Sequence, residues 1–271
     1  MGHLPPKKAE VEPWDVLCVD LIGPYRIRRK GKKDLALHCL TMIDPATGWF
    51  EIMQIPDKRA DNISNLLEQT WLCRYPWPQK VICDRGSEFM AEVKTMLQND
   101  YGCNVTQITT WNPQANAILE RIHQTIGNMI RTYQLPTNNT LDEEDPFSGL
   151  LSAVAFATRA TVHTTLGATP SQLVFGRDAI TNTPFEADWE QIKVKKQKLI
   201  DQNNARENAK RTPHTYKVRD KVWLKTATAT KFGQDPCTGP VDIVTVNDNG
   251  TIIYKHGSLI DKATLETSIL I

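Results

Sequence analysis

The sequence predicts a mixed α/β domain, with helices flanking a mixed sheet, followed by a small β-barrel. Up to about residue 180, short apolar runs bounded by turn residues alternate with segments of helical spacing. After residue 213 only short alternating runs remain, which is typical of small β-barrels. A chain of 271 residues has room for one sizeable core and a smaller module.

The order of elements supports this fold class. Apolar runs with Gly, Pro and charged residues between them predict strands over 14–22, 35–43, 49–55, 80–83, 104–109, 217–225, 240–246, 251–256 and about 260–265. Helical spacing and capping residues predict helices over 61–74, about 88–100, 112–133 (begun by Asn112-Pro113), 146–164, a short one begun by Thr169-Pro170, and 188–211.

Four segments follow from this order. They are an N-terminal linker (1–12), an α/β core (13–180), a helical basic linker (181–214) and a C-terminal barrel (215–271).

Composition excludes several classes of protein. No apolar run approaches the roughly 20 residues of a membrane span, so we expect no membrane role. The six cysteines are scattered without a CxxC pair or a nearby histidine at ligand spacing, so neither zinc nor a disulfide framework is indicated, and the compartment is expected to be reducing.

Basic residues are unevenly distributed, although the net charge is only +1. Residues 26–33 hold six basic side chains, and residues 193–225 hold 11 basic against three acidic ones. The shorter run could equally be a solvated hairpin tip, whereas the longer stretch favours contact with phosphate.

Three acidic residues occupy positions from which carboxylates can converge. Asp20 lies within the first strand, Asp84 directly follows the apolar run 80–83, and Glu120 lies inside the long helix. Oxygen ligands from separate elements suit hard divalent cations, and Asp20 in its apolar context needs a metal ion or cationic partner. Each acid alone could be a surface or capping residue, but the three together favour a metal site.

The acids lie in longer motifs. Asp84 and Glu120 are separated by 35 residues, within CDRGSEF and WNPQANAILERIHQTI, and further motifs are PWDVLCVDLIGPY, TPSQLVFGRD and TGPVDIV. These motifs resemble those of retroviral and gypsy-type LTR-retrotransposon integrases over nearly the whole chain. The resemblance implies a ribonuclease H-like core, an SH3-like C-terminal DNA-binding barrel and a polyprotein origin.

The resemblance also implies an activity. Such a chain is a DDE-type integrase, a metal-dependent polynucleotidyl transferase with endonuclease activity that processes the 3′ ends of element DNA and transfers them into target DNA. Asp20 would bridge two Mg²⁺ ions, Asp84 and Glu120 would each complete one coordination shell, and Mn²⁺ could substitute.

Further residues match the family where it contacts DNA. His123 and Gln124 share the helical face of Glu120, and His123 is expected at solvent or phosphate rather than on a metal ion. Ser87 could equally serve an ordinary turn. The expected DNA-binding residues are Ser87, Pro113, Gln114, Asn116, His123 and Gln124.

The implied partners are double-stranded DNA, as element ends and as target, and further copies of the chain in a dimer or tetramer. The implied location is the nucleus, entered from the cytoplasm within a nucleoprotein complex.

The chain departs from the family at three positions and in one module. Asn112, Ala117 and Val241 replace the usual His, Gly and aromatic residue, and Ala117 would stiffen the loop before Glu120. No His/Cys zinc module precedes the core, so we expect a fragment of a longer polyprotein product or a degraded copy. The alternative function is a decayed or domesticated integrase-like protein that binds DNA or chromatin without catalysis. Another ribonuclease H-like nuclease, or a cut-and-paste transposase, fits the flanking motifs less well.

Overall fold

The computed structural model describes residues 3, 8–9, 12–27, 35–56, 59–83, 92–107, 122–128, 147–211, 214–225, 237–247, 251–264 and 268–270. The chain divides into two compact units. The larger comprises Glu10–Ile108 and Gln114–Ile192, and the smaller comprises Met1–Ala9, Thr109–Pro113 and Lys193–Ile271. The domain limits expected from the sequence stay predictions.

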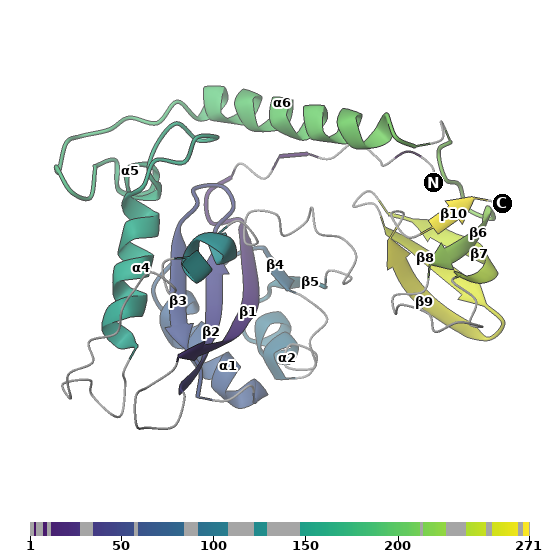
Figure 1. The fold of residues 1–271 in the computed structure, drawn as a ribbon, viewed down its shortest axis with the longest axis horizontal. Helices are drawn as coiled ribbons and strands as arrows, with labels where there is room; N and C mark the ends of the chain where they lie inside the picture. The colour runs from purple at the N-terminus through teal and green to yellow at the C-terminus, as the bar shows by residue number, and fades with distance from the viewer. Residues whose placement is uncertain are drawn as a thin grey trace. The chain divides into compact units, whose positions relative to one another are not determined.

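A mixed five-stranded sheet forms the centre of the larger unit (Figure 1). Its strands follow the order β3-β2-β1-β4-β5. The first three strands pair antiparallel, whereas β4 runs parallel to both β1 and β5. Their bounds are β1 Val16–Ile27, β2 Leu35–Ile43, β3 Phe50–Gln54, β4 Lys80–Cys83 and β5 Asn104–Gln107.

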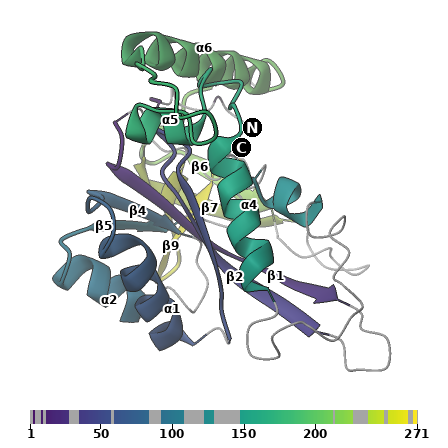
Figure 2. The ribbon, with the colours of Figure 1, turned by 90° about the vertical axis from the view of Figure 1, so that its left-hand side faces the viewer.

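Helices cover both faces of this sheet. Figure 2 shows α1 and α2 on one face and α4 on the other. The helix expected over 61–74 changes its winding part-way, because α1 continues into a π-helical turn, η1. The bounds are α1 Ala60–Leu67, η1 Glu68–Leu72, α2 Glu92–Asn99, a helix at 122–128, α4 Ser148–Ala160 and α5 Pro170–Phe175.

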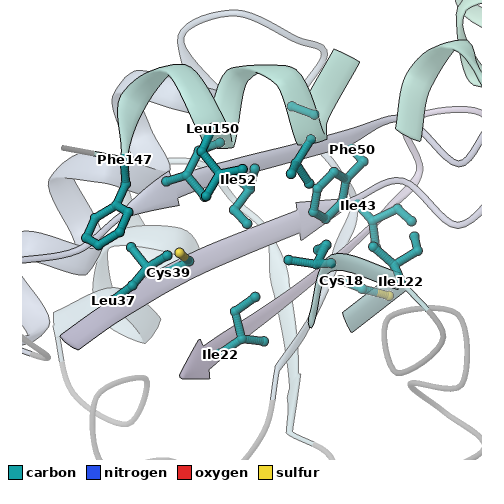
Figure 3. Packing of buried hydrophobic residues seen from close by; sticks show 14 of the residues in the cluster. Cys18, Ile22, Leu37, Cys39, Ile43, Phe50, Ile52, Ile122, Phe147 and Leu150 are labelled. Carbon is teal, nitrogen blue, oxygen red and sulfur yellow. The ribbon is translucent and has the colours of Figure 1, made fainter. Parts of the chain in front are cut away.

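Alternation along β1 builds two hydrophobic cores, one on each face. Cys18 and Ile22 belong to the core shared with α4 and the helix at 122–128, whereas Leu17 and Val19 belong to the core under α1 and α2. Figure 3 shows the first core, in which Ile122 packs with side chains of the sheet. The helix at 122–128 is therefore anchored on the face of β1 that carries Cys18.

The first strand is longer than the sequence indicated. It was expected over 14–22 but runs over Val16–Ile27, with an irregular register between Ile22 and Tyr25. Gly23 accommodates this bulge with a φ of +104°. Trp14 instead lies in a preceding turn.

The smaller unit contains a second five-stranded sheet, antiparallel throughout, in the order β10-β6-β7-β8-β9. Its core includes Val222, Val241, Ile243 and Ile252. The strands are β6 Lys221–Lys225, β7 Cys237–Val246, β8 Thr251–His256, β9 Leu259–Thr264 and β10 Ser268–Leu270, and α6 Trp189–Asn208 begins in the larger unit.

One strand of this sheet was not predicted, and another begins later than expected. β10 pairs with β6, and its first residue, Ser268, is buried. The first barrel strand was expected from residue 217 but begins at Lys221, because 218–219 form a turn. In the described part of the chain, no helix has both the length and the apolar character to cross a membrane.

Candidate functional site

Asp20 lies in the middle of β1, on the same face as Cys18 and Ile22. Its side chain keeps 21% of its surface exposed, so the carboxylate sits at the edge of the first core rather than inside it. Oδ1 accepts a 2.8 Å hydrogen bond from the backbone N–H of Leu21.

Thr41 is the cross-strand partner of Asp20. The two residues are opposite each other in the antiparallel β1–β2 ladder, so their side chains share one face. The Thr41 side chain is fully buried, and its Oγ1 donates a 3.0 Å hydrogen bond to the backbone carbonyl of Asp20. The same Oγ1 lies 3.0 Å from Nε2 of His123.

His123 closes this cluster from the helix at 122–128. Its Nδ1 lies 3.7 Å from Oδ2 of Asp20, and only 15% of its side chain is exposed. Burial lowers the pKa of His123 to about 4, so the ring is neutral at physiological pH. We name Asp20, Thr41 and His123 the Asp20 cluster.

The position of His123 differs from the sequence expectation. A solvent or phosphate contact was expected, but the ring is mostly buried against the sheet. The signal was available in the helical spacing: His123 is three residues before the fully buried Ile126, so both lie on neighbouring positions of one face. Gln124, its neighbour in the helix, is exposed.

The donor atoms of the Asp20 cluster fit a divalent cation. A partly exposed carboxylate oxygen is a hard ligand of the kind that Mg²⁺ and Mn²⁺ prefer, and the ring nitrogen beside it is uncharged. Across the described ranges, no group of three or more His, Cys, Asp or Glu side chains gathers as a metal site. Asp84 and Glu120 lie outside the described residues.

The structure describes few of the other positions that the sequence singled out. Ser87, Pro113, Gln114 and Asn116 lie outside the described residues, as do the substituted positions Asn112 and Ala117. Val241, the third departure from the family, is buried in the core of the second sheet.

A basic surface is present on the smaller unit. Along β6, Val222 and Leu224 point into the core, which leaves Lys221, Trp223 and Lys225 exposed on the other face. We name these three residues the β6 outer face. Two ammonium groups beside an indole ring suit a phosphate backbone and its sugars.

Comparisons with known proteins find similarity to retroelement proteins. The gypsy retrotransposon integrase-like protein 1 of Mus musculus is 27% identical over 134 residues, which is 49% of this chain and 25% of that protein. The Homo sapiens protein of that name is 25% identical over 166 residues, or 61% of this chain and 30% of that one. The Pol polyprotein from transposon 412 of Drosophila melanogaster is 25% identical over 60% of this chain and 12% of its own length.

This chain is similar in sequence to gypsy-type integrase-like proteins. The match spans about a quarter of the length of the first curated relatives. No protein-family model matches the chain.

Solved structures bear on the fold of this chain. A chain of the simian T-cell lymphotropic virus intasome aligns with a TM-score of 0.62 at 13% identity, covering 99% of this chain and 83% of that one. The predicted fold class, a ribonuclease H-like mixed sheet with flanking helices followed by a small SH3-like barrel, is thereby confirmed.

Proposed function

We propose that this chain is the core and C-terminal part of an active retroelement integrase, a polynucleotidyl transferase that processes 3′ ends of element DNA and joins them to target DNA. The observation that carries this proposal is the placement of Asp20. Its carboxylate lies on the sheet face that the helix at 122–128 covers, yet it retains exposed surface. A carboxylate in that position can be reached by both a metal ion and a DNA phosphate.

Asp84 and Glu120 are the proposed co-ligands, and the described neighbours support this. Cys18 is paired with Ile82 in the parallel β1–β4 ladder. Asp20 lies two positions after Cys18 in the sequence, and Asp84 lies two positions after Ile82. Glu120 lies two residues before 122–128, the described part of the helix whose His123 belongs to the Asp20 cluster.

The proposed ions are two Mg²⁺, with Mn²⁺ able to replace them. When bound, such ions activate an attacking oxygen and stabilise the leaving one. The chain's own residues contribute position and charge. Asp20 would supply its carboxylate between the two ions, Asp84 and Glu120 would each hold one, and Thr41 would fix the backbone of Asp20 by its hydrogen bond to that carbonyl.

Double-stranded DNA is the proposed partner, as element ends and as target. The β6 outer face would contact phosphates, and Gln124 is exposed beside the Asp20 cluster. Two element ends must be held together for joining, so a dimer or tetramer is proposed, acting in the nucleus within a nucleoprotein complex.

A strand-transfer assay tests the proposal. Short duplexes that carry element ends are incubated with the chain, a plasmid target and Mg²⁺ or Mn²⁺. The wild-type chain is expected to form joined products, and Asp20→Asn and Asp84→Asn are expected to lose them. Glu186→Gln, which changes an exposed acid elsewhere in the larger unit, is the matched control and should retain them.

Equal product levels in the wild type and both aspartate variants would contradict the proposal. Salt-sensitive DNA binding without any joining would instead support a decayed or domesticated protein that binds DNA or chromatin. If the wild-type chain forms no joined products, Mn²⁺ binding that is lost in Asp20→Asn shows that the metal site is intact and that assembly of the complex has failed.

A further inference from the structure

The hydrogen bonds of the Asp20 cluster fix the proton positions on His123. A carbonyl oxygen can only accept a hydrogen bond. The Thr41 hydroxyl therefore donates its single proton to the carbonyl of Asp20 at 3.0 Å. Its oxygen must then accept from Nε2 of His123 at 3.0 Å. The opposite assignment would leave two lone pairs facing each other around a side chain that is fully buried.

This tautomer determines what His123 presents to Asp20. A hydrogen on Nε2 uses only one ring nitrogen, and a divalent ion at Asp20 would repel a second proton from the ring, so Nδ1 would keep its lone pair. That nitrogen lies 3.7 Å from Oδ2 of Asp20. The two nearest atoms of the pair are therefore both electron-pair donors, which is the arrangement of two ligands on one cation.

From this geometry we infer that His123 is a metal ligand, and that its Nδ1 and Oδ2 of Asp20 bind the same divalent ion. The inference rests on the proposed function, which places an ion at Asp20, and it adds a nitrogen to the expected oxygen ligands. Adjacent ligands of an octahedral ion with bonds of about 2.1 Å lie about 3.0 Å apart, so a small approach from 3.7 Å brings both atoms into range.

A nitrogen ligand changes which ion the site prefers. Imidazole binds borderline ions better than Mg²⁺, and affinity rises along the series of divalent first-row metals. The site is thus expected to bind Mn²⁺ more tightly than Mg²⁺, by a margin that depends on His123. The Thr41 hydroxyl acts through the ring, because its bond to Nε2 holds the tautomer that frees Nδ1.

Pulsed electron paramagnetic resonance of bound Mn²⁺ tests this directly. With the full chain and substoichiometric Mn²⁺, the electron spin echo is expected to show modulation by a nitrogen-14 nucleus. The chain has six histidines, so the variant His123→Ala identifies the source: the modulation should vanish. Thr125→Ala, an exposed position in the same helix, is the matched control and should keep it.

Affinity measurements give a second readout. Mn²⁺ affinity is expected to fall at least about tenfold in His123→Ala, the range typical when a residue supporting a metal site is lost, while Mg²⁺ affinity changes less. Mg²⁺ competition against the Mn²⁺ signal measures the ratio. Thr41→Val should weaken Mn²⁺ binding, and Thr41→Ser, which restores the hydroxyl, should recover it.

Labelling the histidines with nitrogen-15 tests the ligand in the wild-type chain, so the result does not depend on whether a variant folds. The modulation must then change to that of the heavier isotope. Three outcomes overturn the inference. Bound Mn²⁺ that is lost in Asp20→Asn but shows no nitrogen modulation leaves the proposed function standing and refutes the ligand, as expected if a protonated His123 simply pairs with Asp20. Modulation that survives in His123→Ala also refutes it. Mn²⁺ affinity that is unchanged in Asp20→Asn refutes the metal site itself.

Discussion

Arg159 of α4 donates a 2.7 Å hydrogen bond from Nη1 to Oε1 of Glu51 on β3. The hydroxyl of Tyr75 donates to the same oxygen, and the guanidinium lies 4.8 Å from the centre of the Trp49 ring. The Glu51 side chain is only 10% exposed, so its charge depends on these partners. This network joins α4 to the sheet edge.

Arg159→Leu is therefore expected to lower the free energy of unfolding of the larger unit by about 3 kcal/mol, because it leaves the Glu51 carboxylate buried without its cation. Urea titration followed by tryptophan fluorescence measures the change. The double variant Arg159→Leu, Glu51→Leu should recover most of the loss. A control at the exposed Lys210–Glu207 pair, Lys210→Met, should cost less than about 1 kcal/mol, and an equal cost at both sites would contradict the argument.

Gly23→Ala is expected to disrupt the pairing of β1 with β2. A Cβ at this position would lie 2.4 Å from the carbonyl oxygen of Leu37, and the φ of +104° is strained for any other residue. The expected loss of unfolding free energy is about 3 kcal/mol or more. Gly102→Ala has a φ of +67° but open space around the added carbon, so about 1 kcal/mol is expected there. Equal losses in thermal unfolding would refute the steric explanation.

The stability of the smaller unit is expected to fall in acid through Asp220. Burial raises the pKa of Asp220, but hydrogen bonds from the Lys217 backbone N–H and the His214 ring outweigh burial and hold it below its usual value. A depressed folded pKa stabilises the unit above the unfolded value of about 3.9, and this stability is lost as pH falls through the folded pKa. Thermal unfolding from pH 6 to pH 2 should show a smaller acid-induced decrease in Asp220→Asn, and an unchanged profile would contradict this.

Salt dependence of DNA binding measures the contribution of the β6 outer face. The slope of log K against log salt concentration changes by about 0.9 for each phosphate that the protein no longer neutralises. Lys221→Gln with Lys225→Gln is therefore expected to reduce the slope by nearly 2 in fluorescence anisotropy titrations. Lys94→Gln, in α2 of the larger unit, should leave the slope unchanged, and a similar change in both would point to net charge alone.

Tyr216→Phe is expected to loosen the last strand. The Tyr216 hydroxyl donates a 3.2 Å hydrogen bond to the carbonyl of Ser268, the first residue of β10. Losing one such bond costs about 1 kcal/mol. Hydrogen exchange at the Ile269 amide, opposite Trp223, should accelerate in the variant, while exchange at Ile252 in β8 should not.

The sequence predicted the elements whose boundaries are set by local chemistry. The apolar runs at 35–43 and 80–83 match β2 and β4 residue for residue. Thr169 caps α5 through a capping box with Gln172, as Thr169-Pro170 indicated. These signals lie in residues that are neighbours in the sequence, so they can be recognised without knowledge of the fold.

Features that depend on distant partners escaped sequence reasoning. A three-residue strand such as β10 has too short a pattern to stand out, and it forms because β6 lies beside it. His123 looked like a lone surface histidine because its partner Thr41 is 82 positions away. Of the three acids, the structure describes Asp20 alone, so the roles of Asp84 and Glu120 stay predictions.

The bulge in β1 also determines which face of the sheet the later side chains of the strand occupy. Strict alternation would turn Asp20 and Tyr25, five positions apart, to opposite faces. The extra residue at the bulge reverses this alternation, so Tyr25 packs against the same core as Cys18, and a Cβ at Gly127 would lie 3.8 Å from Cε1 of its ring. Without the bulge, a spacing of five positions would separate the acid from the ring that supports its covering helix, whereas deleting Gly23 would leave four positions between them and keep both on one face of a regular strand.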